Sequence, residues 1–336
     1  MDIRKPNGIS AVGLVAEADN QAAQEAVEEP LVGSQHPSMI ALLETAKRAA
    51  AGDTTILLTG ESGTGKDILA RQIHLWSPRR DGPFVVINCT TLAEPLLENE
   101  LFGHVRGAFT GAVSDKPGRL EAGNGGTVLF DEIAELTPSL QARFLRFVQE
   151  QSLERIGGDR TIKVDVRIIA ASNRKLEAEV ATGRFREDLY YRLNVIAFRL
   201  PPLRERPLDI LPLARWMLRQ ASLKAKRAEF LLASEAAEAL SKYRWPGNLR
   251  ELHNAVERAA TLIHTQTITL DDLPDSIRHP ASGMFVPTVH GTRLKDFERE
   301  HILRVLAESS TLEEAAATLG INVSTLWRKR RHYGIA

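Results

Sequence analysis

A short glycine-rich segment between an apolar run and a helical pattern constrains this chain more than any other feature. The segment reads Gly60-Glu61-Ser62-Gly63-Thr64-Gly65-Lys66, with a strand pattern at Ile56–Thr59 before it and a helix pattern at Lys66–Trp76 after it. Glycines at this spacing let backbone N–H groups face phosphate oxygens, and the helix N-terminus and the lysine add positive charge. The segment predicts a nucleotide phosphate-binding loop in which Lys66 reaches the β and γ phosphates; a glycine-rich turn without function is the alternative.

The residue that follows the lysine departs from the general loop pattern. Asp67 stands where a serine or threonine usually provides a magnesium ligand. A carboxylate in the first turn of a helix is electrostatically favourable. We therefore expect the magnesium ligand at this position to be either missing or a carboxylate.

A second apolar run ends in two carboxylates. It reads Gly125-Gly126-Thr127-Val128-Leu129-Phe130-Asp131-Glu132. At the end of a strand, Asp131 is placed to hold Mg²⁺ directly or through water, and Glu132 is placed to polarise the attacking water. Alone, this pair is also compatible with a helix N-cap, but with the phosphate loop it predicts the catalytic pair of an ATPase.

Four other polar residues extend the predicted site. Asn173 ends another strand pattern, where it is placed to sense the γ phosphate, although such residues are more often turn formers. Arg186 and Arg192 lie on a predicted helix, and Arg250 opens a later one. The alternative for the two arginines is a solvated helix face paired with neighbouring acids.

The pattern along the chain predicts an α/β fold, a parallel sheet flanked by helices, with a helical lid and a small all-α domain behind it. The expected strands are Thr54–Thr59, Phe84–Asn88, Val128–Asp131, Val166–Ala171 and Val195–Leu200. After Leu208 we expect helices without strands, at Leu208–Lys224, Ser234–Tyr243 and Asn248–His264. The expected domains are a tail at 1–28 with no room for a sensory domain, an ATPase core at 29–264 with its lid at about 208–264, a linker at 265–292 and a DNA-binding domain at 293–336.

Composition limits the cellular setting and the partners. No apolar run is long enough to span a membrane, and a single cysteine, Cys89, fits a reducing cytoplasm. The 43 basic and 43 acidic residues cancel, so that any nucleic-acid footprint must be local. Four consecutive basic residues, Arg328 to Arg331, provide one.

Those basic residues belong to a predicted helix-turn-helix. Thr311–Gly320 has the apolar stripe of a first helix, and Ser324 caps a second one that runs to about Tyr333. We expect Leu326 and Trp327 to face inward. The expected contacts with double-stranded DNA are Ser324, Thr325, Arg328, Lys329 and Arg331; a solvated basic helix is the alternative.

Another short segment has the composition of a mobile contact loop. It reads Gly107-Ala108-Phe109-Thr110-Gly111-Ala112 and follows Glu100-Leu-Phe-Gly-His104. Its glycines permit an irregular backbone and argue against a buried strand or helix. We expect Phe109 to be an exposed apolar anchor for a partner.

Six motifs together resemble one family. GESGTGKD, ELFGHVRGAFTGA, GGTVLFDE, FREDLYYRLNV, LPPLRER and WPGNLREL occur in the order found in the central domain of NtrC-type bacterial enhancer-binding proteins. The resemblance covers residues 31 to 264 and is greatest to AlgB-type response regulators, without their receiver domain. Acidic residues are common in this family at the position of Asp67. The C-terminal segment resembles Fis-type domains, which dimerise through a preceding helix.

The resemblance implies a function and residue roles. It implies an AAA+ ring, usually a hexamer, that hydrolyses ATP between subunits and remodels the closed promoter complex of the sigma-54 RNA polymerase holoenzyme. Lys66 would bind phosphate, Asp131 Mg²⁺, and Glu132 would activate water under the restraint of Asn88. Arg186 and Arg192 would be fingers inserted into the neighbour's site, and Phe109 and Thr110 would touch sigma-54.

Two other functional classes remain open from the sequence, and the mode of control is open as well. One is a DNA-binding regulator that uses ATP only to assemble, and the other is a general AAA+ unfoldase or loader. Without a receiver domain, we expect the protein to be constitutively active or held by a separate regulatory protein.

Overall fold

The structure is a computed structural model that describes residues 31, 33–90, 92–279, 298–299, 301–303, 305–306, 309 and 311–333. These residues fall into two compact units, one within Met1–Pro280 and one within Ala281–Ala336. Each unit has its own buried apolar cluster. Residues 1–30, which include the expected tail at 1–28, lie outside the described part.

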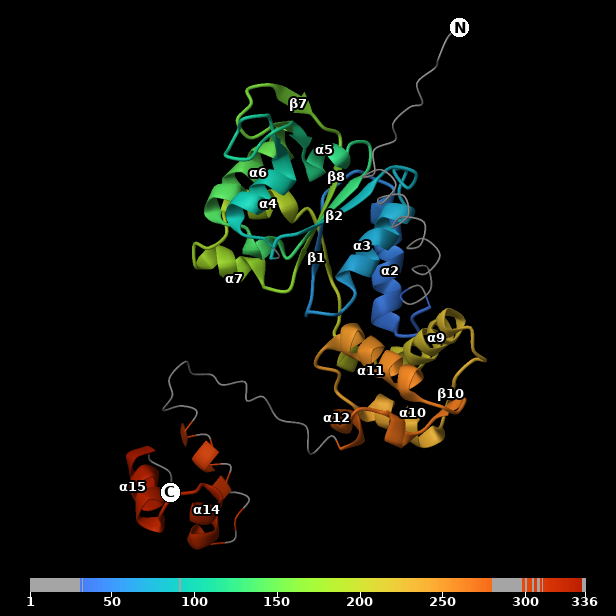
Figure 1. The fold of residues 1–336 in the computed structure, drawn as a ribbon, viewed down its shortest axis with the longest axis vertical. Coiled ribbons are helices and arrows are strands. Elements are labelled where there is room, and N and C mark those ends of the chain that lie inside the picture. The colour runs from blue at the N-terminus through green and yellow to red at the C-terminus, as the bar shows by residue number, and fades with distance from the viewer. Residues whose placement is uncertain are drawn as a thin grey trace. The chain divides into compact units, whose positions relative to one another are not determined.

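A five-stranded parallel sheet forms the centre of the first unit (Figure 1). Its strands are β1 (Ile56–Thr59), β2 (Phe84–Asn88), β5 (Thr127–Asp131), β8 (Arg167–Ser172) and β9 (Ile196–Arg199), in the order β2-β5-β8-β1-β9. This sheet confirms the predicted α/β fold and all five expected strands. Because every strand runs in one direction, the polar residues that follow β1, β5 and β8 meet at one edge of the sheet.

Helices cover both faces of the sheet, so that its central strands are apolar on both sides. Alternate residues of β1 show this, since Leu58 packs with one apolar cluster and Leu57 with the other. One face carries α2 (Pro37–Ala50) and α3 (Lys66–Leu75). The other face carries α4 (Glu94–Phe102), α5 (Arg119–Ala122), α6 (Pro138–Glu150), α7 (Leu176–Ala181) and α8 (Glu187–Leu193).

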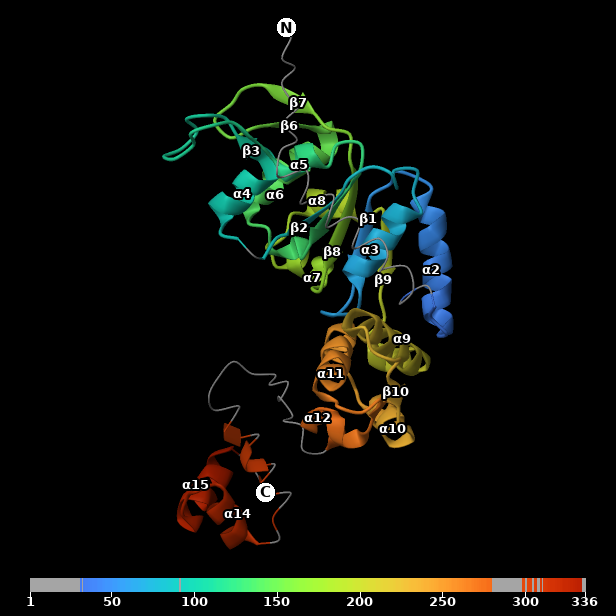
Figure 2. The same cartoon turned by 45° about the vertical axis from the view of Figure 1, so that its right-hand side comes forward.

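Two small hairpins stand on the second face. The first pairs β3 (Gly103–His104) with β4 (Lys116–Pro117), and the second pairs β6 (Ser152–Glu154) with β7 (Thr161–Lys163). The segment between β3 and β4 contains the predicted contact loop and projects away from the sheet (Figure 2). A short 3-10 helix, η1 (Ile133–Glu135), follows β5.

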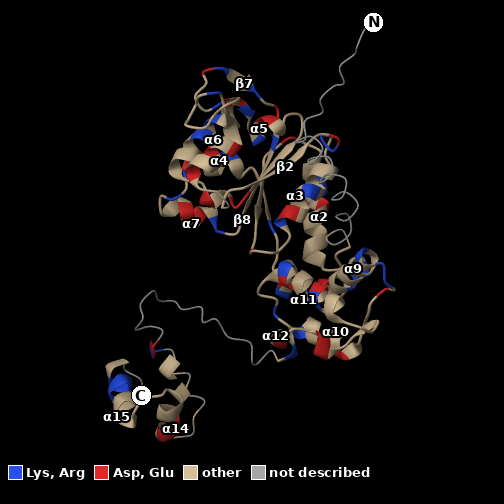
Figure 3. Ribbon diagram, viewed as in Figure 1, with Lys and Arg blue, Asp and Glu red and all other residues tan. Residues whose placement is uncertain are grey.

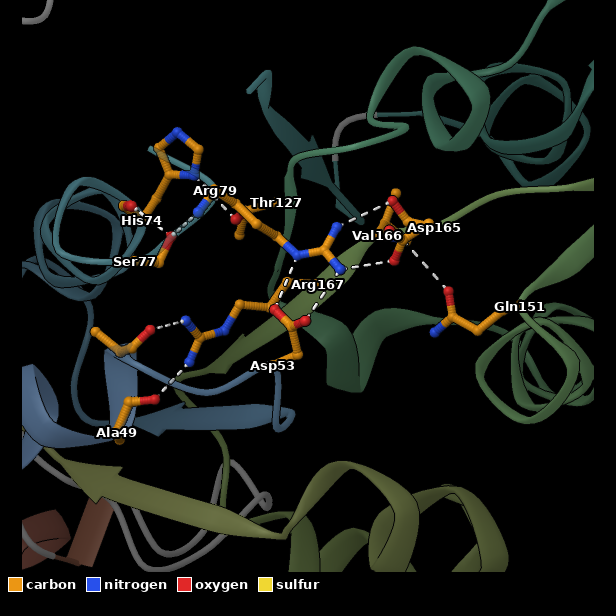
Figure 4. Close-up of polar contacts among 11 residues, drawn as sticks. Ala49, Asp53, His74, Ser77, Arg79, Thr127, Gln151, Asp165, Val166 and Arg167 are labelled. Atoms are coloured by element: carbon orange, nitrogen blue, oxygen red, sulfur yellow. Dashed lines mark hydrogen bonds and ion pairs between the residues drawn. The ribbon is translucent and has the colours of Figure 1, made fainter. Parts of the chain in front are cut away.

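A buried arginine fixes α2 at the sheet edge opposite to the phosphate loop (Figure 4). Arg167, which begins β8 and is 1% exposed, donates to the carbonyl oxygens of Ala49 and Ala50 at 2.8 Å each. These carbonyls belong to the last turn of α2, where carbonyl oxygens lack the i+4 partners of the helix interior, and the guanidinium donates to them instead. Beside it, Arg79 bonds the carboxylates of Asp53 and Asp165.

A mainly helical lid follows the sheet. It contains η2 (Leu203–Glu205), α9 (Pro207–Ala225), α10 (Ser234–Lys242), α11 (Asn248–Leu262), η3 (Leu270–Asp272) and α12 (Asp275–Arg278). The expectation of a lid without strands is wrong, because β10 (Leu231–Leu232) pairs in parallel with β11 (Thr267–Ile268). The linker also begins later than residue 265. Ile268, Leu273 and Ile277 are buried in the lid, and the polar residues and prolines between them hide this apolar spacing in the sequence.

The second unit is a small helical domain. Helix α14 (Leu312–Thr318) and helix α15 (Val323–Tyr333) are joined through Gly320, which has a φ of +65°. This arrangement confirms the predicted pair of helices. Its buried cluster consists of Ile302, Val305, Ala315, Ala316 and Leu326. In the part of the chain that the structure describes, no helix is both long and apolar enough to cross a membrane.

Candidate functional site

The glycine-rich loop curls between β1 and α3 as its sequence predicts. Gly60, Gly63 and Gly65 have φ angles of +152°, +76° and +95°, which side chains other than glycine rarely adopt. Lys66 is only 5% exposed, and its Nζ donates to the carbonyl oxygens of Gly60 (2.9 Å) and Glu61 (3.1 Å). The ammonium therefore lies inside the curve of the loop, beside the N-terminus of α3, where phosphate oxygens find positive potential.

The two predicted catalytic carboxylates lie at the end of β5, on the same sheet edge. The backbone N–H of Glu132 donates to Asp131 Oδ1 at 3.1 Å. Glu132 itself has a left-handed backbone with φ of +54°, an uncommon state for this residue type. Its Oε2 accepts a hydrogen bond of 2.9 Å from the backbone N–H of Asn173, the residue that follows β8. Residues from three elements thus converge at this edge.

The charges of this edge act on one another. Burial lowers the pKa of Lys66, and Glu132, Asp131 and Asp67 oppose that shift in this order. Burial raises the pKa of Asp131, and the nearby ammonium of Lys66 opposes that shift. A charged lysine and charged carboxylates therefore stabilise each other here, and each charge would be more costly to bury alone.

The carboxylates at this edge suit a divalent cation that keeps water ligands, rather than one whose ligands all come from the protein. Among the described residues, no group of three or more His, Cys, Asp and Glu side chains could hold a metal ion. Mg²⁺ usually takes one or two carboxylates together with water and phosphate oxygens. Asp131 is half-buried next to Lys66 and offers such a carboxylate; Asp67 is exposed on the first turn of α3.

The lid holds the phosphate loop through side chains that the sequence analysis missed. Arg204 makes a two-pronged ion pair with Glu61 at 2.6 and 2.7 Å. The buried Arg206 donates to the carbonyl oxygen of Thr64 at 2.8 Å. Both arginines belong to the motif LPPLRER, which follows the last core strand. Their position directly after the core was the sequence signal that could have indicated a contact with the phosphate loop. The carboxylate of Glu61, a predicted nucleotide-binding residue, makes this contact with the lid.

The start of α11 holds the loop from a second position. Asn248, which is fully buried and has a φ of +52°, donates to the carbonyl oxygen of Ser62 at 3.0 Å. Arg250 donates to the hydroxyl of Ser62 at 2.8 Å, which brings this predicted residue to the nucleotide site. The backbone N–H of Leu249 donates to Gly63 O at 2.8 Å. A lid displacement therefore changes the phosphate loop itself.

Three other predicted residues do not reach this group in the structure. Asn88 lies opposite Asp131 in the sheet register, but its side-chain oxygen accepts from the N–H and hydroxyl of Thr90, at 2.9 and 2.6 Å. The described contacts include none between Asn88 and Glu132. Arg186 and Arg192 are exposed at the two ends of α8, on the other face of the sheet from α3, and Arg186 pairs with Asp188 at 2.7 Å.

The predicted contact loop lies apart from these residues. Gly107 and Gly111 have positive φ, and a Cβ added at either position would meet nothing within 4 Å. Phe109 is 45% exposed, and its ring contacts that of His104 at a centroid distance of 4.9 Å. Thr110 is exposed, while Ala112 is buried at the base of the loop. The loop therefore presents an aromatic ring and a hydroxyl on a backbone with room to move.

The C-terminal helix separates its predicted contacts into two faces. Ser324, Arg328 and Arg331 are exposed, whereas Thr325 is half-buried. Lys329, another expected contact, is half-buried, and its ammonium pairs with Glu298. The expectation that Trp327 faces inward is wrong, because this side chain is 55% exposed, whereas Leu326 is buried. Figure 3 shows the basic residues gathered on α15.

Family models match nearly the whole described chain. The sigma-54 interaction domain matches residues 32–199, an AAA+ ATPase lid domain matches residues 204–286, and a Fis-family bacterial regulatory domain matches residues 293–333. The order of these matches reproduces the sheet with its covering helices, the lid and the helix-turn-helix.

Known proteins resemble the chain over most of its length. It is 49% identical to the alginate biosynthesis transcriptional regulatory protein AlgB of Pseudomonas aeruginosa, covering 90% of this chain and 67% of that protein. It is 44% identical to the response regulator protein FleR of the same species, over 86% of this chain and 67% of FleR.

A solved structure gives the same result. The crystal structure of NtrX from Brucella abortus in complex with ATP superposes with a TM-score of 0.71 at 31% identity, covering 96% of this chain and 73% of that one. Shared domains, shared order and high identity identify the activity as well as the fold. The chain therefore belongs to the family of sigma-54-dependent transcriptional activators, as an AAA+ ATPase with a helical lid and a Fis-type helix-turn-helix.

Proposed function

We propose that this activator binds ATP at the loop of residues 60–66 and hydrolyses it with Glu132 as the base that orients the attacking water. The observation that supports this role is the convergence of three elements: Glu132 is fixed by the N–H of Asn173, next to Asp131 and near the buried Lys66. Fixed charges at such an edge stabilise a transferring phosphoryl group without reorganisation. Arg250, already hydrogen-bonded to Ser62, closes the lid side of the site.

Mg²⁺ fits this site next to Asp131, where it would neutralise charge on the phosphates. The half-buried carboxylate of Asp131 and the nearby Asp67 are the residues that would hold it with water. Lys66, whose Nζ lies inside the curve of the loop, would bind the phosphates beside them.

Completion of the site requires a second copy of the chain in this proposal. Arg186 and Arg192 are exposed and lie on the face of the sheet away from α3, so that neither reaches the nucleotide loop of its own subunit. A ring, a hexamer as is usual in this family, would let them enter a neighbour's site, where an arginine stabilises the transition-state charge. Arg186 would have to exchange its bidentate contact with Asp188 for contacts with phosphate oxygens. Asn88 would bond Glu132 only after releasing Thr90.

The loop of residues 107–112 is proposed to grip sigma-54 through Phe109 and Thr110. Its exposed aromatic ring and its unobstructed glycines support this assignment, because a contact that moves with nucleotide state needs both an anchor and a compliant backbone. The C-terminal domain would bind double-stranded DNA upstream of the promoter, and a separate regulatory protein would control activity.

Open-complex formation with sigma-54 polymerase tests this function. With wild-type protein and ATP we expect open promoter DNA, detected by permanganate reactivity of unpaired thymines. Thr110→Ala should abolish open complexes while ATP turnover remains, and Thr110→Ser, which keeps the hydroxyl, is the matched control. Full activity of Thr110→Ala would contradict the assigned role of the loop, and open complexes without nucleotide would contradict the role of ATP.

A further inference from the structure

One exposed stripe runs along the C-terminal helix α15. Its members are spaced as neighbours on one helix face: Ser324, Trp327, Arg328 and Arg331. The other side of the helix contains the buried Leu326 and the half-buried Lys329, which pairs with Glu298. Three hydrogen-bond donors thus surround one large apolar side chain on the face directed away from the domain's core.

The side chain of Trp327 does not belong to the apolar core of its domain. More than half of its surface, 55%, is accessible, and neither the buried cluster nor the partly buried side chains described as packing on it include this ring. Removing a large aromatic surface from water is one of the strongest driving forces available to a protein contact. The Trp327 ring is therefore accessible to a partner of this helix face.

A neighbouring arginine orders the indole. The guanidinium carbon of Arg331 lies 5.6 Å from the centroid of the Trp327 ring, one helical turn away. This distance is within the range of a cation–π contact. The contact restricts the ring to the surface of the helix and reduces the entropy that a partner contact would otherwise cost.

We infer that Trp327 is a specificity-determining residue that packs its indole against the 5-methyl group of a thymine in the DNA major groove. The inference rests on the DNA binding proposed for this domain. In helix-turn-helix proteins, the N-terminal part of the second helix contacts base edges, and Trp327 is the fifth residue of α15. Hydrogen-bond donors distinguish guanine, but only an apolar surface recognises the thymine methyl.

The charge around the ring favours DNA over a second protein chain. α15 contains no acidic residue, and Arg328 and Arg331 flank the indole on its exposed face. Charged residues are depleted at the centre of protein–protein contacts, whereas phosphate contacts require them. The two arginines would bind phosphates, which carry no sequence information, and Trp327 would supply part of the sequence preference.

Selection from a random DNA pool tests the inference. Full-length wild-type protein, Trp327→Gln, Trp327→Phe and Arg331→Gln are each used to select duplexes with about 20 random base pairs, enough for two half-sites one helical turn apart. We expect the wild type and Trp327→Phe to select a thymine at a defined position of each half-site. Trp327→Gln should lose that preference, while Arg331→Gln should keep it and bind more weakly.

Affinity measurements on the selected duplex give the second readout. Replacing the selected thymine by uracil removes only the methyl group and should weaken wild-type binding about fourfold, the factor expected for one buried methyl. The same change should leave Trp327→Gln unaffected. In salt titrations, Arg331→Gln should reduce the slope by about 1, and Trp327→Gln should leave the slope unchanged.

The outcomes separate this inference from the proposed function. If the wild type selects no sequence, the proposed DNA binding fails and the inference fails with it. If the wild type selects a site and Trp327→Gln selects the same thymine equally well, only the inference is overturned. A change of oligomeric state in Trp327→Gln, seen by sedimentation with the base preference intact, would assign the ring to a protein contact instead. Circular dichroism of each variant verifies that the helices are retained.

Discussion

Two glycine-rich loops of this protein differ in almost every physical respect except composition. In the loop of residues 60–66, each residue from Glu61 to Thr64 is bonded to the lid, and Lys66 is buried. In the loop of residues 107–112, a Cβ added at either positive-φ glycine would meet nothing within 4 Å, and Phe109 is 45% exposed. Glycine allows close approach in the first loop and freedom of movement in the second.

The two loops differ in rigidity as their proposed roles in phosphoryl transfer and in contact with sigma-54 require. Stabilisation of phosphoryl transfer requires charges and N–H groups that are already in position, because reorganisation during the reaction costs rate. A contact that changes with nucleotide state requires a segment whose alternative positions are close in free energy. The hydrogen bonds between the phosphate loop and the lid would transmit a displacement of that loop to the lid.

The largest expected effect is on catalysis. Glu132→Gln keeps the size and the hydrogen bond from Asn173 N–H but removes the carboxylate that polarises water. We expect ATP turnover to fall by roughly a hundredfold or more, as is typical for loss of a general base. Nucleotide affinity, measured by fluorescence titration with a labelled ATP analogue, should remain within a factor of about three. Turnover near the wild-type rate would mean that another group activates water.

A matched pair of glycine substitutions addresses the comparison directly. Gly63 and Gly107 have nearly equal φ, +76° and +83°, but a Cβ at Gly63 would lie 2.4 Å from Gly247 O, and one at Gly107 would meet nothing within 4 Å. Gly107→Ala should cost only the left-handed backbone penalty, about 1 kcal/mol. Gly63→Ala adds a clash with the lid and should cost roughly 3 kcal/mol.

Thermal and denaturant unfolding of both variants measure these free energies. Titration with nucleotide measures the effect of each substitution on ATP affinity. We expect Gly63→Ala to weaken ATP binding and Gly107→Ala to leave it unchanged. Equal destabilisation by the two substitutions would show that the lid does not confine the phosphate loop.

A smaller effect is expected on acidification, and it should arise at the C-terminal end of α3, the helix that follows the phosphate loop. His74 in α3 is buried and bonds the hydroxyl of Thr127 at 2.9 Å; burial, followed by the nearby Arg71, lowers its pKa to about 4. Because the unfolded state binds the proton more readily, stability is lost as the pH falls below about 6.5, by about 2 kcal/mol at pH 5. His74→Asn, which retains a hydrogen-bonding group, should remove this part of the acid sensitivity in urea unfolding at pH 7 and pH 5. An unchanged pH dependence would exclude His74 as its source.

Local sequence patterns predicted the helices and strands. They could not predict contacts between residues far apart in the sequence. The apolar runs that end at Thr59, Asp131 and Ala171 predicted the parallel sheet and the convergence of its polar ends, because strand direction alone determines that edge. The pairing of β10 with β11 was missed, since two residues are too short for a periodic signal. The contacts of Arg204 and Asn248 with the loop link positions more than 140 residues apart, which no local pattern reveals.

The C-terminal helix shows a different limit. Its existence and basic character followed from the sequence, but its rotation about its own axis did not. Leu326 and Trp327 are both apolar, and only the packing of the domain places the first inside and the second outside. The same rotation turns Lys329 toward Glu298 and away from the exposed stripe. A helix of eleven residues offers too few apolar positions to define its buried face.

Binding of sigma-54 in different nucleotide states tests whether ATP cleavage at the loop of residues 60–66 moves the loop of residues 107–112. The affinity of the full chain for purified sigma-54 is measured with ADP, with a non-hydrolysable ATP analogue and with a phosphoryl-transfer transition-state analogue. We expect affinities that differ by about tenfold or more between these states, a population shift of about 1.4 kcal/mol, and loss of the difference in Phe109→Ala. The same affinity in all three states, with wild-type protein that hydrolyses ATP, would contradict it.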